Sequence, residues 1–294
     1  MEDITELQSR LRNAGYIADP QLAAALSLVM QLHRPLLIEG EAGVGKTEVA
    51  KALAAAFGRK LIRLQCYEGL DVNAAVYEWN YQRQLLAIKI QESAHAPAQN
   101  TERHIFGPEF LLKRPLLAAI TEAEPPVLLI DEIDRADEEF EAYLLELLSD
   151  FQISIPELGT IQATSIPLVV LTSNATRELS DALRRRCLFL WIDYPSYEKE
   201  LQVVRSKVDG LGERLAGEVT RFLQSLRRTE LAKVPGVAET LDWARALVVL
   251  HATGLDASLV RETLGCVLKD EADLRRTVAA LDSGALEGMI RVPA

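Results

Sequence analysis

The sequence predicts an α/β fold: a mostly parallel sheet covered by helices, followed by a smaller all-helical domain. Two observations lead to this prediction. Up to Pro195, short apolar runs that suit buried strands alternate with amphipathic helical patterns, as in a parallel sheet with helices on both faces. Beyond Pro195 the helical patterns continue without a convincing strand. We therefore expect an αβα domain over residues 1–194, with an insert around residues 67–115, and a helical domain over residues 195–294.

Individual elements follow from hydrophobic periodicity. The expected strands lie within residues 34–40, 60–66, 125–134, 166–174 and 187–193. The expected helices are residues 4–13, a second one after Pro20, one from about Thr47 to Phe57, and residues 137–150. The segment "FQISIPELGTIQA" is typical of a hairpin, with its turn near Gly159.

The overall charge of the chain is negative. Its 294 residues hold 32 Lys and Arg against 43 Asp and Glu, which gives a formal net charge of −11. Such a chain does not neutralise phosphates by default, so we expect no general nucleic-acid binding. No C-x-x-C, H-E-x-x-H or G-x-S-x-G pattern occurs, which disfavours the corresponding metal sites and hydrolases.

Cysteine usage and the chain start point to the cytoplasm. Cys66, Cys187 and Cys266 are far apart in sequence, which predicts no disulfide framework and suits a reducing compartment. The start "MEDITELQSR" is acidic and lacks the apolar core of a secretory signal. The longest apolar stretch, around residues 22–30, is too short to cross a bilayer. We expect no direct membrane insertion.

The stretch "GEAGVGKT", residues 40–47, matches the pattern G-x-x-x-x-G-K-[ST]. Its glycines let successive backbone N–H groups form a nest for phosphate oxygens. The Lys46 ammonium suits the β- and γ-phosphates, the Thr47 hydroxyl suits Mg²⁺, and the following helix adds its N-terminal partial charge. We therefore expect ATP to contact Gly40, Glu41, Ala42, Gly43, Val44, Gly45, Lys46, Thr47 and Glu48.

An acidic pair follows the apolar run in "VLLIDEID". Asp131 would emerge at the carboxyl end of a buried strand, where ligands of such sheets bind, and would hold Mg²⁺ through water. Glu132 would orient and polarise the water that attacks the γ-phosphate. Together with the glycine-rich loop, the pair predicts Mg²⁺-dependent hydrolysis of ATP to ADP and phosphate.

Two further motifs leave alternatives open. Asn174 ends the run "LVVLTSN", so its amide either contacts the attacking water or the γ-phosphate, or belongs to a turn or helix cap. Three arginines, Arg184, Arg185 and Arg186, precede the last predicted strand. They form either a solvated surface cluster or an arginine finger that stabilises the transferring phosphoryl group.

With these motifs in this order, the chain resembles an AAA+ ATPase, and more closely the MoxR family. Within that family it is similar to the CoxD-like branch, which is associated with carbon monoxide dehydrogenase and related molybdenum hydroxylases. The block "CYEGLDVNAAVYEWNYQRQLL" selects this branch. Further segments that carry the likeness are "IFGPEFLLKRPLLAAI", "LLIDEIDRADEEFEAYLLELLSD", "TSNATRELSDALRRRC" and "VAETLDWARAL".

The resemblance implies a P-loop AAA+ αβα domain with a helical lid, assembled as a ring, usually a hexamer, with nucleotide between subunits. It implies that Arg186, or next Arg185, reaches the γ-phosphate of the neighbouring subunit, and that Asn174 occupies the sensor-1 position. It also implies a partner with a von Willebrand factor A domain. The expected function is an ATP-hydrolysing chaperone that assists maturation of the metal–sulfur centre of a molybdenum hydroxylase client.

One departure from the family pattern concerns the lid. Glu239 and Thr240 stand where many AAA+ lids carry a sensor-2 arginine, and the nearest arginine is Arg245. A nucleotide-gated scaffold with slow turnover therefore stays an alternative, as does a DNA-linked motor. The aromatic residues of segment 67–86 either grip a client or pack the insert; they are Tyr67, Tyr77, Trp79 and Tyr81.

Overall fold

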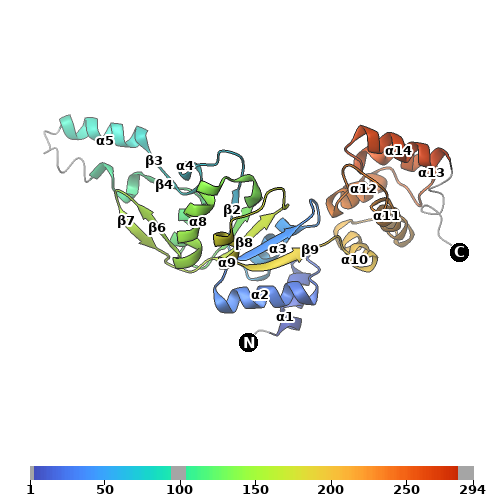
Figure 1. Cartoon of the computed structure of the whole chain (residues 1–294), viewed down its shortest axis with the longest axis horizontal. Helices are drawn as coiled ribbons and strands as arrows, with labels where there is room; N and C mark the ends of the chain where they lie inside the picture. Colours follow the sequence, from blue (N-terminus) through green and yellow to red (C-terminus); the bar gives the residue numbers. More distant parts are fainter. Residues whose placement is uncertain (1–2, 94–103, 284–294) are drawn as a thin grey trace. The chain divides into compact units, whose positions relative to one another are not determined.

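The computed structural model describes residues 3–93 and 104–283 (Figure 1). Its central sheet has five strands in the order β2-β5-β8-β1-β9. The pairs β2–β5, β5–β8 and β8–β1 are parallel. In chain order, the bounds of the five strands are β1 Leu36–Gly40, β2 Leu61–Gln65, β5 Val127–Asp131, β8 Leu168–Ser173 and β9 Leu188–Ile192.

Each of the five strands lies inside a run that the sequence predicts as a strand. Every residue of the central strands β1, β5 and β8 is buried, as expected for a parallel sheet covered on both faces. The predicted α/β fold with a parallel sheet is therefore confirmed.

The register of the sheet places polar residues side by side at its carboxyl edge. Ile130 of β5 pairs with Leu171 of β8, so the next residues, Asp131 and Thr172, emerge together. Glu39 of β1 pairs with Ser173 of β8 on the other side. Because parallel strands end at the same edge, residues from three distant sequence segments meet there.

Four helices match the sequence prediction. Wherever the prediction gave a first or last residue, the observed one differs from it by at most one position. These helices are α1 (Ile4–Asn13), α2 (Pro20–Leu32), α3 (Lys46–Ala56) and α8 (Glu138–Asp150). Asp137 caps α8 by accepting a 2.8 Å hydrogen bond from the backbone N of Phe140. The apolar face of α8 is buried, as its periodicity predicts. The other helices before β9 are α4 (Val72–Ala75), α5 (Tyr81–Ser93), α7 (Pro115–Thr121) and α9 (Asp181–Arg186), with 3₁₀ turns at Pro108–Phe110 and Ile133–Arg135.

Two small antiparallel sheets extend this part of the chain. β6 (Gln152–Ile155) and β7 (Gly159–Gln162) form the predicted hairpin. β3 (Tyr77–Trp79) pairs with β4 (Leu111–Lys113), and α5 projects from this pair (Figure 1). Trp79 is buried and contacts the Phe106 ring edge-on, whereas Tyr67 and Tyr81 are exposed. The aromatic residues of the insert therefore divide between packing and surface.

Contacts between Cα atoms divide the chain into two compact units. The first comprises residues 1–7, 20–39 and 49–191; the second comprises residues 8–19, 40–48 and 192–294. The glycine-rich loop thus groups with the C-terminal helices, which the sequence did not lead us to expect. Among residues 193–283, which the structure describes, there is no strand.

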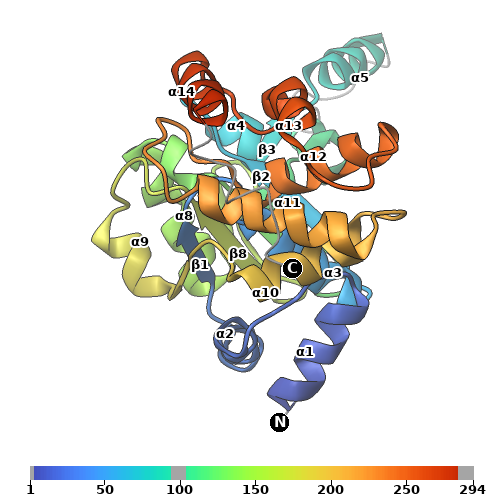
Figure 2. The same ribbon diagram turned by 90° about the vertical axis from the view of Figure 1, so that its right-hand side faces the viewer.

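The C-terminal helices pack around their own apolar core. Phe222 and Trp243 lie at its centre with ring centroids 5.3 Å apart, and α10 packs on α11 and α12 (Figure 2). The helices are α10 Tyr197–Lys207, α11 Glu213–Leu226, α12 Val237–Val249, α13 Ala257–Thr263 and α14 Glu271–Asp282, with a 3₁₀ turn at Leu264–Cys266. No helix in the described part of the chain has the length and apolarity needed to cross a bilayer.

Candidate active site

The glycine-rich loop turns between β1 and the start of α3. Helix α3 begins at Lys46, whose side chain is 7% exposed. The Lys46 ammonium donates hydrogen bonds of 2.7 Å to the carbonyl oxygens of Gly40 and Glu41. These bonds place a buried positive charge inside the loop, at the N-terminus of a helix, where anions are favoured.

The loop's conformation requires glycine. Gly43 and Gly45 have φ angles of 75° and 95°, in the left-handed range that other residues rarely adopt. A Cβ atom at Gly45 would meet nothing within 4 Å, so the backbone there borders open space. This cradle fits phosphate groups. Thr47 and Asp131 offer the oxygen donors that Mg²⁺ prefers.

On its other side the loop contacts the start of α12. The backbone N of Val237 donates a 2.8 Å hydrogen bond to the carbonyl oxygen of Gly43. The approach is so close that a Cβ atom on Gly236 would lie 2.6 Å from the Gly43 Cα atom. The backbone of the helical region thus supports the phosphate loop directly.

The residues at the expected sensor-2 position have other partners. The Glu239 carboxylate accepts a 2.9 Å hydrogen bond from the backbone N of Gly236 and caps α12. Thr240 is buried and donates to Glu200. Arg245 is exposed, forms an ion pair with Asp242, and lies eight residues along α12 from Val237, about 12 Å by helix rise. No arginine of α12 therefore stands at its loop-contacting end.

A buried ion pair supports that end of α12. The Arg227 guanidinium bonds both oxygens of Glu200, at 2.6 and 2.7 Å, and both side chains are almost fully buried. Arg227 also donates to the carbonyl oxygens of Pro235 and Gly236. It therefore fixes the turn that carries Val237 toward Gly43. Nothing in the local sequence pattern around Arg227 indicates this role.

The acidic pair follows β5 in the first unit. Asp131 is 2% exposed and has a partner on each oxygen. Its Oδ1 accepts a 2.5 Å hydrogen bond from the Thr172 hydroxyl, and its Oδ2 forms a 2.5 Å ion pair with Arg63 of β2. Neighbouring strands on both sides thus orient this carboxylate.

Glu132 adopts an unusual backbone conformation. Its φ and ψ angles are 55° and 50°, a left-handed geometry that is uncommon for residues other than glycine. Its backbone N donates a 2.9 Å hydrogen bond to the Thr172 hydroxyl oxygen. The Glu132 side chain is partly exposed, with Arg135 3.4 Å from its carboxylate. Strained backbone of this kind clusters at functional sites.

Asp134 connects the acidic segment to the segment that follows β8. Its Oδ2 accepts hydrogen bonds from the backbone N of Asn174 at 3.2 Å and from the backbone N and hydroxyl of Thr176 at 3.1 and 2.6 Å. Ala175, between these two, has a φ angle of 54°. The Asp134 Oδ1 atom is buried without a partner in the described residues. Asn174 is therefore held beside the acidic segment through its backbone, leaving its amide for other contacts.

The three arginines of α9 have three different environments. Arg184 forms a bidentate ion pair with buried Glu39, with N–O distances of 3.2 and 3.3 Å. Arg186 donates to the Ser149 hydroxyl at 2.5 Å and to the carbonyl oxygen of Ala182 at 2.9 Å. The Arg185 side chain is 82% exposed, and its nearest carboxylate is Asp181 at 3.9 Å. Arg185 is the one of the three whose side chain is mostly exposed to solvent.

A family model described as "AAA domain (dynein-related subfamily)" matches residues 35–187, from the start of β1 to the end of the α9 arginines. The chain belongs to this family. The AAA domain therefore includes the phosphate loop, the acidic pair, Asn174 and the arginines, and the matched range ends before the C-terminal helices.

One relative of this AAA protein has a name that states its role. The denitrification regulatory protein NirQ of Stutzerimonas stutzeri is 24% identical over 84% of this chain and 82% of its own length. An uncharacterized protein of Staphylococcus epidermidis is 24% identical over 86% of this chain and 92% of its own. Among solved structures, the Holliday junction branch migration motor RuvB of Thermotoga maritima is 17% identical, covers 98% of this chain and 78% of that one, and has a TM-score of 0.47.

Sequence reasoning missed three residues that organise the site of the AAA domain. Thr172, Asp134 and Arg63 each bond a predicted site residue or its backbone. The threonine had a visible signal: Thr172 and Ser173 are polar residues within an otherwise apolar strand. A buried polar residue needs a partner, and here the partner is the acidic pair.

The two thiols of this AAA domain, Cys66 and Cys187, are buried and form no disulfide. Burial raises the pKa of Cys66 to about 12, helped by the nearby carboxylates of Asp131, Asp134 and Glu132. Burial likewise raises the pKa of Cys187 to about 12. Raised pKa values keep both thiols protonated at neutral pH, as is usual for buried structural cysteines.

Proposed function

We propose that this AAA protein is a Mg²⁺-dependent ATPase that hydrolyses ATP to ADP and phosphate. One observation carries the proposal. Thr172 and Asp134 hold the acidic pair and the Asn174 segment together at the carboxyl edge of the sheet. A structural salt bridge would not need the left-handed Glu132 or the paired polar bridges around it.

In this proposal the residues divide the work. The loop from Gly40 to Glu48 holds the ATP phosphates through backbone N–H groups, and Lys46 balances their charge. Thr47 and Asp131 hold Mg²⁺, which neutralises charge on the phosphates. The Glu132 carboxylate orients the attacking water and accepts its proton, and the Asn174 amide positions that water.

We further propose that the chain works as a ring, with six subunits as the expected number, and that α9 completes the neighbouring site. Arg186 was the first choice from the family motif, with Arg185 second. The hydrogen bonds of Arg186 to Ser149 and Ala182 favour Arg185, because the Arg185 side chain is 82% exposed and its nearest carboxylate, Asp181, is 3.9 Å away. Such a residue stabilises the transferring phosphoryl group from outside.

For the biological role we propose a MoxR-type chaperone of the CoxD-like branch. The block from Cys66 to Leu86 supports this branch, and one relative is described as a denitrification regulatory protein. The proposed client is a molybdenum hydroxylase such as carbon monoxide dehydrogenase, with a von Willebrand factor A protein as partner. We place the protein in the cytoplasm, which suits its three free cysteines.

We also propose that residues 1–194 form the nucleotide-binding domain and that residues 195–294 form a separate domain that acts as a lid. Its support is the direct bond between Val237 and the phosphate-loop residue Gly43. The C-terminal helices would sense the loop through backbone contact and the Arg227–Glu200 pair rather than through an arginine on α12.

The substitution Glu132→Gln tests the enzymatic proposal. It should abolish ATP hydrolysis and leave ATP affinity within about twofold, because it removes a proton acceptor and not a phosphate contact. Glu138→Gln, in the exposed first turn of α8, is the matched control and should hydrolyse ATP normally. Hydrolysis by the Glu132→Gln variant at the normal rate would refute the assignment.

The Glu132→Gln variant also tests the identity of the proposed client protein. Held with ATP in the source cell, Glu132→Gln should stall on its client, and captured proteins are identified by mass. Recovery of a von Willebrand factor A protein with molybdenum hydroxylase subunits supports the maturation role. Recovery of DNA-processing proteins supports a motor instead. No ATP-dependent capture, combined with slow turnover, supports a nucleotide-gated scaffold.

A further inference from the structure

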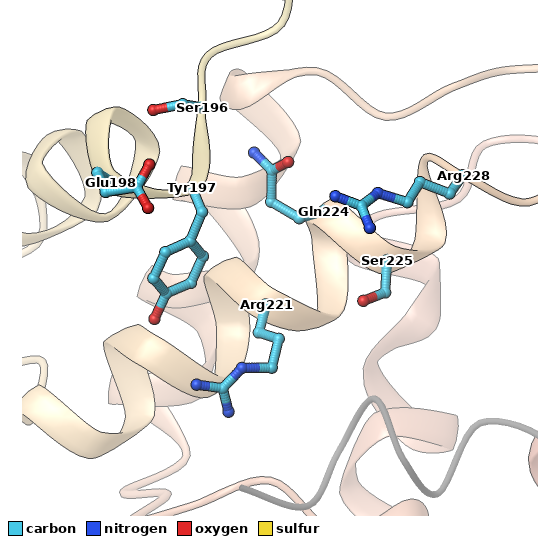
Figure 3. A pocket seen from close by; sticks show the side chains of 7 residues that line it. All are labelled: Ser196, Tyr197, Glu198, Arg221, Gln224, Ser225 and Arg228. Atoms are coloured by element: carbon cyan, nitrogen blue, oxygen red, sulfur yellow. The ribbon is translucent and has the colours of Figure 1, made fainter.

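A polar hollow lies among the C-terminal helices, formed by the start of α10 and one side of α11 (Figure 3). Its volume is about 480 Å³. It belongs wholly to the second unit and shares no lining residue with the phosphate loop. The residues that line it are Ser196, Tyr197, Glu198, Arg221, Gln224, Ser225 and Arg228.

Two arginines of this hollow have no carboxylate partner in the part of the chain that the structure describes. The Nη1 atom of Arg221 is buried and has no hydrogen bond there, and its guanidinium stacks on the Tyr197 ring at 6.0 Å. The exposed Arg228 side chain likewise has no ion pair or hydrogen bond to described residues. By contrast, Arg214 and Arg227, close by on the same segment, are bonded to Glu218 and Glu200.

The chain has eleven more acidic than basic residues, yet neither arginine pairs with a carboxylate among the described residues. A buried donor without an acceptor costs free energy, so it calls for a partner. Arg221 lies in α11 and Arg228 in the turn that follows it, and both line the hollow. Figure 3 shows Gln224 and Ser225 between them.

The other polar groups of the hollow do not neutralise the arginines. Ser196 caps α10 by accepting a hydrogen bond from the backbone N of Lys199. The Glu198 carboxylate accepts from its own backbone N–H and from the Ser196 hydroxyl, which holds its pKa below its ordinary value. The Gln224 amide donates to Glu200 and to the carbonyl oxygen of Pro195. The Glu198 carboxylate thus has its hydrogen-bond partners within its own segment.

We propose that this hollow binds a phosphate group of a small molecule, separately from the nucleotide held by the phosphate loop. Two unpaired guanidinium groups match the charge of a phosphate, which is about −1.5 to −2 at neutral pH, better than that of a single carboxylate. The planar fork of arginine suits phosphate oxygens. The Ser225 hydroxyl adds a neutral donor on the same surface.

Inorganic phosphate is the probe, with the phosphate loop disabled by Lys46→Ala so that binding there does not interfere. Calorimetry on the full-length Lys46→Ala protein should give saturable binding with a Kd of about 1 mM or tighter. Nε–Hε signals of ¹⁵N-labelled arginine should shift for Arg221 and Arg228 during the same titration. Acetate and chloride at equal ionic strength separate phosphate recognition from general anion binding.

Substitution identifies the residues. Adding Arg221→Gln and Arg228→Gln should weaken phosphate binding at least about tenfold, since each removes charge-assisted hydrogen bonds. Arg275→Gln, which removes an exposed lid arginine paired with Glu271, is the control and should change nothing. Arg228→Gln alone keeps the test valid if the Arg221 variant fails to fold, because Arg228 is exposed.

Equal phosphate binding with and without the two arginines would overturn the proposal, as would the lack of saturable binding in the Lys46→Ala protein. Equal affinity for acetate would also overturn it and would identify a carboxylate site instead. None of these outcomes bears on ATP hydrolysis, because the hollow contains no residue of the proposed catalytic site.

Discussion

The Thr172 hydroxyl donates a 2.5 Å hydrogen bond to Asp131 Oδ1. The same oxygen accepts a 2.9 Å hydrogen bond from the backbone N of Glu132. One buried side chain of β8 therefore fixes both members of the acidic pair that follows β5. The bond to Asp131 orients the proposed Mg²⁺ ligand, and the bond to Glu132 supports its left-handed backbone.

Replacing Thr172 by valine should lower kcat for ATP hydrolysis at least about tenfold, with ATP binding largely unchanged. The change leaves a buried carboxylate oxygen and a backbone N–H without this partner, at a cost of about 1–3 kcal/mol. Thr172→Ser keeps the hydroxyl and should stay within about threefold of the original rate. A valine variant with full activity would show that the bridge has no catalytic role.

The contact between Gly236 and Gly43 should make the turn before α12 intolerant of any side chain at position 236. Gly236→Ala places a Cβ atom 2.6 Å from the Gly43 Cα atom, although its own φ of −84° suits alanine. The clash must displace the phosphate loop or the start of α12, so ATP should bind about tenfold more weakly. Nucleotide titration followed by fluorescence measures this.

Gly265→Ala is the matched control, because a Cβ atom there would meet nothing within 4 Å. Normal ATP affinity in both variants would mean that the loop adapts to the added methyl group without functional loss.

Arg185 should be needed for hydrolysis and not for ATP binding. Arg185→Ala is expected to reduce the rate by about 10³-fold if its guanidinium stabilises the phosphoryl group of a neighbouring subunit. Arg186→Ala should instead reduce stability by about 1 kcal/mol, because Arg186 bonds Ser149 and the Ala182 carbonyl within its own chain.

Mixing the Arg185→Ala and Glu132→Gln proteins tests action between subunits. Each protein is expected to be inactive alone. In the proposed ring, a mixture would contain sites with Glu132 from one protomer and Arg185 from its neighbour. Recovered ATP hydrolysis would support a finger that acts in trans, whereas a mixture that stays inactive would argue against it.

Arg63 should stabilise the fold through Asp131. The Asp131 side chain is only 3% exposed, and Arg63→Gln removes the cation that is paired with its carboxylate. Because the Arg63 side chain is itself 48% exposed, solvent screening reduces the effect, and we expect a loss of about 1 kcal/mol in the free energy of unfolding. Urea denaturation measures it. Arg245→Gln breaks an exposed pair and should cost less than about 0.5 kcal/mol; equal losses would contradict the expectation.

The C-terminal helices should lose stability in acid through Asp273. Its carboxylate accepts hydrogen bonds from the backbone N–H groups of Ala232 and Lys233 and from Arg276, which lower its pKa from the ordinary 3.8. A lowered pKa in the folded state means that the stabilisation is present above pH 3.8 and is lost as the pH falls toward the folded-state pKa.

Urea unfolding of Asp273→Asn against the unchanged protein should therefore show a clear difference at neutral pH that shrinks below about pH 3.8. The exposed Glu271→Gln variant serves as the control and should show little difference at either pH. A difference that is constant across this range would show that Asp273 stabilises the helices by shape rather than by charge.

Much of the fold follows from local sequence patterns. The five sheet strands lie in apolar runs that the alternation of strand and helix identifies, and the hairpin at Gly159 follows from its turn residue. The phosphate loop is similarly local, because its glycines, Lys46 and Thr47 lie within eight residues. In such segments the residues that determine the conformation are close in the chain.

The supporting residues could not be predicted in this way. Arg63 reaches Asp131 because β2 is the neighbour of β5, and Thr172 does so because β8 lies on its other side. Strand order and register depend on how all the strands pack, and a single sequence does not specify them locally. The same holds for Arg227, whose partner Glu200 lies on another helix.

By itself, the sequence determined that this chain has a phosphate loop and an acidic pair after a buried strand, since both depend on short-range composition. Only the tertiary structure decided which of three adjacent arginines is exposed. Consecutive helical residues point about 100° apart, so each meets a different neighbour: Glu39, 145 residues away, binds Arg184, and Ser149, 37 residues away, binds Arg186. Arg185 has only its own helix nearby and faces solvent.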